Sequence, residues 1–134
     1  MRRAESLPRR WGEARRIEAL RDRPMARLDA AIPGLRVNGS MRARIPGNLN
    51  LTVPGATAAE LMARIPAVCV STGSACSSAA IEPSYVLRAL GLSEEEAGRT
   101  LRVGIGRFTS APEIDSGAAA FTAADAAASV FAGA

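Results

Sequence analysis

Two short segments of strictly alternating apolar and polar residues, 48–53 and 100–105, constrain the fold of this chain more than any other feature. In each, the leucine, isoleucine and valine side chains take one face and the intervening residues take the other. A period of two is typical of strands that bury one face of a sheet. Weaker strand patterns occur at 35–37 and 67–70. The sequence therefore predicts a small sheet with one buried face.

Helical patterns separate these strands. An apolar helical stripe starts at Gly12 and meets Pro24, which costs about 3 kcal/mol inside a helix, so we expect a kink or two short helices there. Three capping boxes mark further helix starts, at Thr57/Glu60, Ser93/Glu96 and Ser110/Glu113. The order of elements predicts an α/β domain of two layers, with a small mixed or antiparallel sheet and helices on one face.

The length of 134 residues suits a single domain. We expect residues 1–12, with their proline and paired arginines, to form a disordered or frayed arm, and residues 13–134 to form the domain. No apolar run reaches the roughly 18 residues of a membrane span, and the start lacks the apolar core of a signal peptide. We therefore expect no membrane partner and a cytoplasmic protein with reduced cysteines.

The net charge of +4 is unevenly distributed. Residues 1–44 carry twelve arginines against five acidic residues, a net charge of +7. Such an arm can indicate nucleic-acid binding, but it contains no aromatic residue except Trp11 and no known nucleic-acid-binding pattern. We interpret the arginines as a solvated helix surface, so no nucleic-acid partner is expected.

The chain contains no histidine and no lysine, so all seventeen basic residues are arginines. Without histidine, no imidazole is present to act as an acid or base near pH 7. Without lysine, no side chain can form a Schiff base with a carbonyl cofactor. These two absences exclude much of enzyme chemistry for the chain acting alone.

The most reactive residue predicted by the sequence is Cys76, which lies in a run of small residues over 71–78. The neighbours lack the bulk to bury it, so a functional thiol is favoured over a packed one. Cys69, between two valines of a predicted core strand, is interpreted as a packing residue. The spacing of the two cysteines matches no zinc motif, so no metal site formed by this chain alone is expected.

Two other loop chemistries were tested against the sequence. A cysteine phosphatase loop needs an arginine six residues after the cysteine, and that position is Glu82. The segment 104–109 begins like a dinucleotide fingerprint but lacks its third glycine. Arg107 in this segment follows a predicted strand and can offer a planar fork to a carboxylate, although a plain surface arginine is an equally good interpretation.

Four segments in this order resemble the C-terminal, small-domain part of cysteine desulfurases, which are class-V aminotransferase relatives. The likeness is to the long-loop group that serves iron–sulfur cluster assembly. It spans about residues 13–125 and rests on Pro46–Leu51, Ser71–Ser78, Glu82–Leu92 and Leu101–Thr109.

This resemblance implies the small domain of a fold-type I pyridoxal-phosphate enzyme. In that family a lysine of the large domain carries the cofactor, which holds L-cysteine as an imine. A loop thiolate attacks the substrate sulfur and leaves alanine and an enzyme persulfide. Cys76 matches this nucleophile, and Arg107 matches the arginine that holds the substrate carboxylate.

The resemblance also implies partners for this chain. They are a large-domain chain or a homodimer mate, and an iron–sulfur scaffold protein that receives the sulfur. Cys76 could then also ligate a cluster bound to that scaffold. No lysine of this chain can hold pyridoxal phosphate covalently, so we expect the chain alone to be inactive. The alternatives are a non-catalytic module that carries a persulfide or binds a scaffold, and a degenerate fragment without a function.

Overall fold

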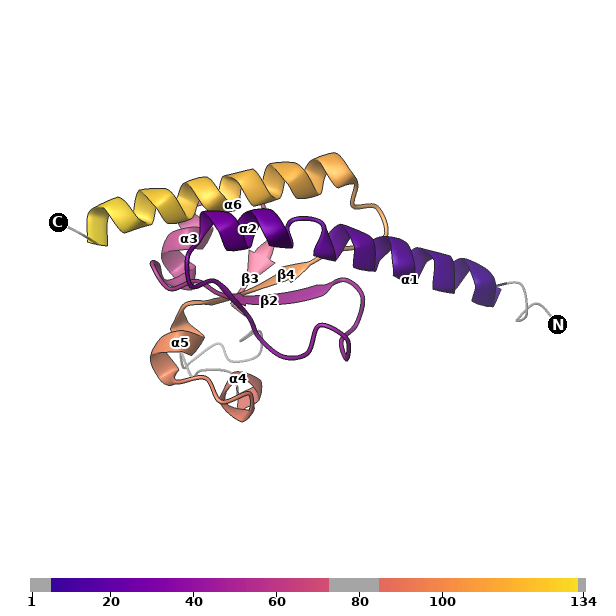
Figure 1. The fold of residues 1–134 in the computed structure, drawn as a ribbon, viewed down its shortest axis with the longest axis horizontal. Helices are drawn as coiled ribbons and strands as arrows, with labels where there is room; N and C mark the ends of the chain where they lie inside the picture. The colour runs from indigo at the N-terminus through magenta and orange to yellow at the C-terminus, as the bar shows by residue number, and fades with distance from the viewer. Residues whose placement is uncertain (1–5, 73–84, 133–134) are drawn as a thin grey trace.

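The structure is a computed structural model that describes residues 6–72 and 85–132, with side chains from Arg10 to Thr72 and from Tyr85 to Val130. Figure 1 shows the helices and the sheet of these residues. In chain order the elements are α1 (Ser6–Asp22), α2 (Met25–Ala31), β1 (Arg36–Val37), β2 (Asn48–Thr52), α3 (Ala58–Arg64), β3 (Val70–Ser71), α4 (Tyr85–Ala89), α5 (Glu94–Gly98), β4 (Thr100–Gly104) and α6 (Ala111–Ala132).

The four described strands form one sheet in the order β1-β2-β4-β3, and all neighbouring pairs are antiparallel. The two alternating segments of the sequence are the central strands β2 and β4. Leu51 pairs with Leu101 and Leu49 with Val103, so the apolar residues of both strands lie on the same face. The predicted alternation is confirmed, with an apolar face of the sheet that packs into the core.

The core lies between this face and helices α2, α3 and α6, which Figure 1 shows on one side of the sheet. Helix α6 contributes Phe121 together with small alanines, which let the helix backbone approach the sheet closely. The largest fully buried side chains are Ile32, Leu49, Leu51, Val53, Leu61, Thr100 and Leu101. The predicted α/β architecture is therefore confirmed, but the prediction that the helices lie on one face of the sheet is wrong, because α4 and α5 lie on the other face (Figure 1).

The proline in the first helical pattern separates two helices. Helix α1 ends at Asp22 and α2 begins at Met25, with Pro24 in the position before it. The carbonyl of Pro24 accepts from the amide of Leu28 at 2.9 Å. A proline is tolerated at a helix start because it lacks only an N–H that would have no partner there.

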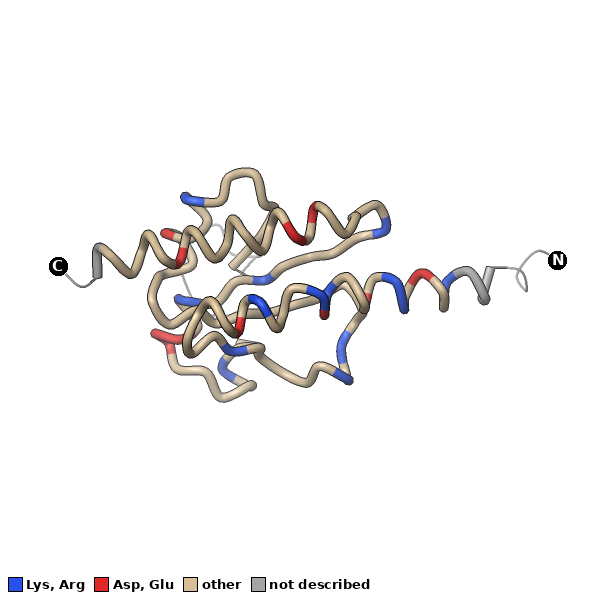
Figure 2. Tube along the Cα trace, turned by 45° about the horizontal axis from the view of Figure 1, so that its top comes forward, with Lys and Arg blue, Asp and Glu red and all other residues tan. Residues whose placement is uncertain are grey.

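The N-terminal helix also begins earlier than the apolar pattern predicts. Helix α1 starts at Ser6, ahead of Gly12. Figure 2 shows basic and acidic positions interspersed along this helix. Directly after α1, Arg23 connects the end of this helix to α6. Its Nε and Nη2 both lie 2.8 Å from the carboxylate of Asp115. The division into an arm and a domain at residue 12 stays a prediction.

The capping boxes predicted at Thr57 and Ser93 are both present. At α5, the amide of Ser93 donates to the Glu96 carboxylate at 2.8 Å, and Arg36 of β1 donates to the same carboxylate at 2.7 Å. These two contacts, the first more than the second, hold the pKa of Glu96 below its usual value. At the third site, the amide and hydroxyl of Ser110 both donate to Glu113.

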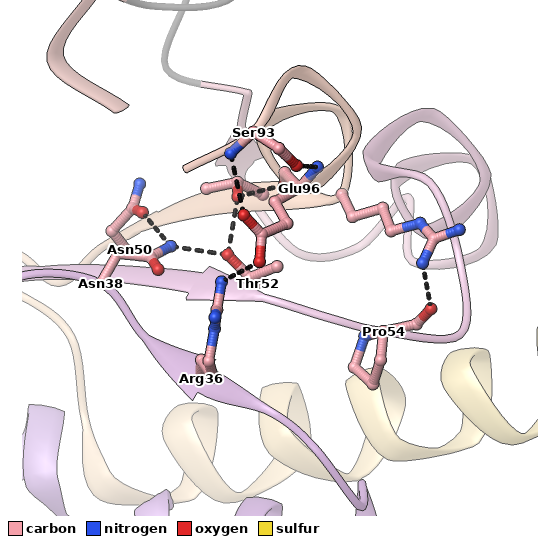
Figure 3. A network of polar contacts seen from close by, with 9 residues as sticks. Arg36, Asn38, Asn50, Thr52, Pro54, Ser93 and Glu96 are labelled. Atoms are coloured by element: carbon pink, nitrogen blue, oxygen red, sulfur yellow. Dashed lines mark hydrogen bonds and ion pairs between the residues drawn. The ribbon is translucent and has the colours of Figure 1, made fainter. Parts of the chain in front are cut away.

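The other face of the sheet carries a buried chain of hydrogen bonds, drawn in Figure 3. The hydroxyl of Thr100 donates to the carbonyl of Glu96 at 2.8 Å. The 2.8 Å contact between the hydroxyls of Thr52 and Thr100 is therefore donated by Thr52. The side-chain amide of Asn38 donates to the hydroxyl of Thr52 and to the side-chain carbonyl of Asn50, at 2.8 Å each. This chain ties the loop after β1, both central strands and α5 together.

Helices α4 and α5 lie on this second side of the sheet, away from α6 (Figure 1). Only Leu87 of α4 is buried, and Tyr85 is 83% exposed. Within residues 6–72 and 85–132, no helix combines the length and hydropathy needed to cross a bilayer.

Candidate functional site

Arg107 lies in a tight turn directly after β4. The turn is closed by the amide of Thr109, which donates to the carbonyl of Gly106 at 3.2 Å. The hydroxyl of Thr109 accepts from the amide of Gly106 at 3.1 Å. The side chain of Arg107 is 68% exposed, so the turn presents the guanidinium to solvent.

Helix α1 braces this turn through Arg16. Its Nη1 donates to the carbonyl of Thr109 at 2.9 Å, and its Nη2 donates to the carbonyl of Arg107. One guanidinium thus holds two backbone carbonyls on either side of Phe108. The backbone that carries Arg107 is fixed by a helix more than 90 residues away in the sequence.

The guanidinium of Arg107 is itself paired with Glu13, also on α1. Its Nε lies 2.7 Å from one carboxylate oxygen and its Nη2 lies 3.1 Å from the other. The hydrogen bonds to Glu13, and then its charge, raise the pKa of Arg107 above its usual value. No described residue accepts a hydrogen bond from Nη1 of Arg107.

An open groove of about 590 Å³ lies between α1 and the neighbouring ends of β2 and β4. Glu13 and Ile17 line its helical side, and Gly47 and Ile105 line its sheet side. The backbone amide of Ile105 donates to the carbonyl of Gly47 at 2.8 Å. The two residues lie so close that a Cβ on Gly47 would collide with the carbonyl of Ile105. The floor of the groove next to the Glu13–Arg107 pair therefore requires glycine at position 47.

Cys76, the predicted nucleophile, lies in segment 73–84, outside the described residues. The chain enters that segment after β3, which pairs with β4 through Val70 to Val103 and Ser71 to Arg102. The assignment of Cys76 stays a prediction.

The interpretation of Cys69 as a packing residue is wrong, because its side chain is exposed. Val68 and Val70 both pack against the core. Within the described part of the chain, no group of three histidine, cysteine, aspartate or glutamate side chains could hold a metal ion.

Sequence reasoning missed Glu13 and Arg16 as parts of this site. Their spacing of three places them on one face of α1, but the same spacing is common on any charged helix surface. No local pattern indicates that this face meets the turn after β4.

No family model matches this chain. Among curated proteins, the cysteine desulfurase IscS of Anaeromyxobacter sp. Fw109-5 is 52% identical over 103 residues, which are 77% of this chain and 26% of the relative. The mitochondrial cysteine desulfurase of Arabidopsis thaliana is 48% identical over 99 residues, 74% of this chain and 22% of the relative. The chain thus spans about a quarter of the length of these relatives.

Two solved structures share the fold. A NifS-like protein from Rickettsia africae ESF-5 matches with a TM-score of 0.67 and 23% identity, over 83% of this chain and 28% of that one. Another NifS-like protein matches with a TM-score of 0.68 and 18% identity, over 84% of this chain and 28% of that one. The chain is therefore similar to cysteine desulfurases over about a quarter of their length, which fits the C-terminal part of such an enzyme.

Proposed function

We propose that this chain supplies two working groups of a cysteine desulfurase. Cys76 would accept the substrate sulfur as a persulfide, and Arg107 would bind the substrate carboxylate. The observation that carries the proposal is 45–52% sequence identity to curated cysteine desulfurases over about three quarters of this chain. The two proposed groups lie in residues 71–78 and 101–109, two of the segments that carry the resemblance to this family.

The environment of Arg107 supports carboxylate binding. The guanidinium is exposed at the end of a strand on a braced turn, and it already holds one carboxylate, that of Glu13, in a two-bond arrangement. Two parallel N–H···O bonds to a planar carboxylate are the geometry in which arginine binds this group best. An amino-acid substrate would present the same chemistry.

Relatives of this kind imply pyridoxal phosphate, but the residues of this chain do not suit a covalently held aldehyde cofactor. Such a cofactor needs a lysine, and the chain has none. We propose that the cofactor is held elsewhere, by a lysine of a separate large-domain chain. L-cysteine as substrate and an iron–sulfur scaffold as sulfur acceptor, with Cys76 able to ligate the scaffold's cluster, belong to the same proposal.

The test is transfer of labelled sulfur to the chain. The chain is mixed with a separately expressed large domain of a relative, pyridoxal phosphate and L-[³⁵S]cysteine, and the protein-bound label is measured without reductant. We expect label on the wild type and on Cys69→Ser, which removes the other thiol, and none on Cys76→Ser. Label that persists in Cys76→Ser would refute the role of Cys76.

The same assay separates a desulfurase part from a persulfide carrier. A part of the enzyme needs Arg107, so Arg107→Gln should slow labelling strongly and raise the cysteine concentration needed for half-maximal rate. A carrier takes sulfur from a complete desulfurase, so when a complete desulfurase replaces the large domain it would be labelled equally well in Arg107→Gln. Equal labelling would refute the proposed role of Arg107.

A further inference from the structure

We propose that Glu13 is a positioning residue for Arg107. It would hold one edge of the guanidinium so that the opposite edge is presented to the carboxylate of a small amino-acid ligand. This inference rests on the proposed function of Arg107 as the carboxylate-binding residue.

The contact uses only part of the guanidinium. An arginine side chain carries five N–H donors in one plane. Glu13 takes the Nε donor and one donor of Nη2, at 2.7 Å and 3.1 Å. The two donors of Nη1 and the second donor of Nη2 form the outer edge, and no described residue accepts from Nη1. This edge can accept a second carboxylate through two parallel bonds while Glu13 stays in place.

The same helix fixes the arginine at both ends. Arg16 binds the backbone carbonyls of Arg107 and Thr109, and Glu13, one helical turn earlier, binds the guanidinium. Without Glu13, a side chain that is 68% exposed would sample many rotamers. Ordering it before the ligand arrives lowers the entropy lost on binding.

Glu13 also has an opposing effect, because its negative charge repels an incoming carboxylate. The pair is exposed on the arginine side, where water and salt weaken repulsion between charges. We therefore expect orientation to outweigh repulsion at physiological ionic strength. If removing the charge of Glu13 weakens carboxylate binding, orientation dominates. If it strengthens binding, repulsion dominates.

The experiment measures L-alanine binding to the full chain by NMR in 0.15 M salt. The variant Glu13→Gln keeps the shape of the side chain but removes its charge. We expect the Arg107 Nε–H signal to exchange faster with water and the alanine affinity to fall roughly two- to five-fold, the range of an exposed ion pair. Glu18→Gln on the same helix makes the same charge change without any contact to Arg107, and it should bind like the wild type.

The outcomes separate this inference from the proposed function. If Arg107→Gln abolishes binding but Glu13→Gln binds equally or more tightly, the positioning role is wrong and Arg107 remains the carboxylate site. Binding by the wild type that does not depend on Arg107 overturns both, and no binding at all overturns the positioning role. A fall in affinity in Glu18→Gln as large as that in Glu13→Gln would assign the effect to net charge and also overturn the positioning role.

Discussion

The carboxylate of Asp125 on α6 is buried against the turn at Gly55, and its removal should stabilise the fold. The residue is 7% exposed, and its Oδ1 has no hydrogen-bond partner among the described residues. This oxygen faces Gly55, and a Cβ added to that glycine would lie 3.3 Å from it. Burial raises the pKa of Asp125 above its usual value.

The sign of the pH dependence follows from this raised pKa. Between the unfolded pKa of about 3.9 and the higher folded pKa, the folded state binds more protons than the unfolded state. The free energy of unfolding therefore falls as pH rises through this window, by about 1.4 kcal/mol for each unit of difference between the two pKa values. At neutral pH the full cost is present.

Asp125→Asn removes the charge and keeps the shape. We expect it to raise the free energy of unfolding at neutral pH by about 1.4 kcal/mol for each unit by which burial raises the pKa of Asp125. The gain should vanish near pH 4, where the wild-type carboxyl is protonated in the folded state. Urea unfolding followed by circular dichroism across this pH range measures it.

Asp115→Asn, on the same helix, is the matched control. Its carboxylate pairs with Arg23, and the hydrogen bond from that arginine holds the pKa of Asp115 below its usual value. This variant should lose stability at neutral pH, and the wild type should lose the same contribution as pH falls through the folded pKa. The reasoning on Asp125 is refuted if Asp125→Asn is destabilising at neutral pH or if its gain is the same at every pH.

Three further changes test the packing by urea unfolding. Gly47→Ala forces a Cβ against the carbonyl of Ile105 and should cost more than about 2 kcal/mol, whereas Gly104→Ala, with open space at its Cβ, should cost under about 1 kcal/mol. Thr100→Val breaks the buried hydroxyl chain and should cost about 1–3 kcal/mol. Thr57→Ala removes the cap of α3 and should cost about 1 kcal/mol. A cost near zero for Gly47→Ala, Thr100→Val or Thr57→Ala would contradict the contact assigned to that residue.

The sequence alone determined the elements of the fold and their boundaries to within a few residues. The alternation in 48–53 and 100–105 predicted β2 and β4, Pro24 predicted the break between α1 and α2, and Thr57 and Ser93 predicted two helix starts. These features depend on neighbours within about four residues, so they can be read locally. The resemblance to cysteine desulfurases also came from the sequence, and curated proteins of that name, 48–52% identical over about three quarters of this chain, confirm it.

Only the tertiary structure decided which polar groups meet. The exposure of Cys69 depends on how the chain enters β3, with Val68 and Val70 packed against the core on either side of it. The burial of Asp125 depends on where α6 crosses the turn at Gly55. The pairing of Glu13 with Arg107 joins residues 94 positions apart. Contacts at such separations arise from the packing of whole elements, and the local periodicity of one chain carries no record of them.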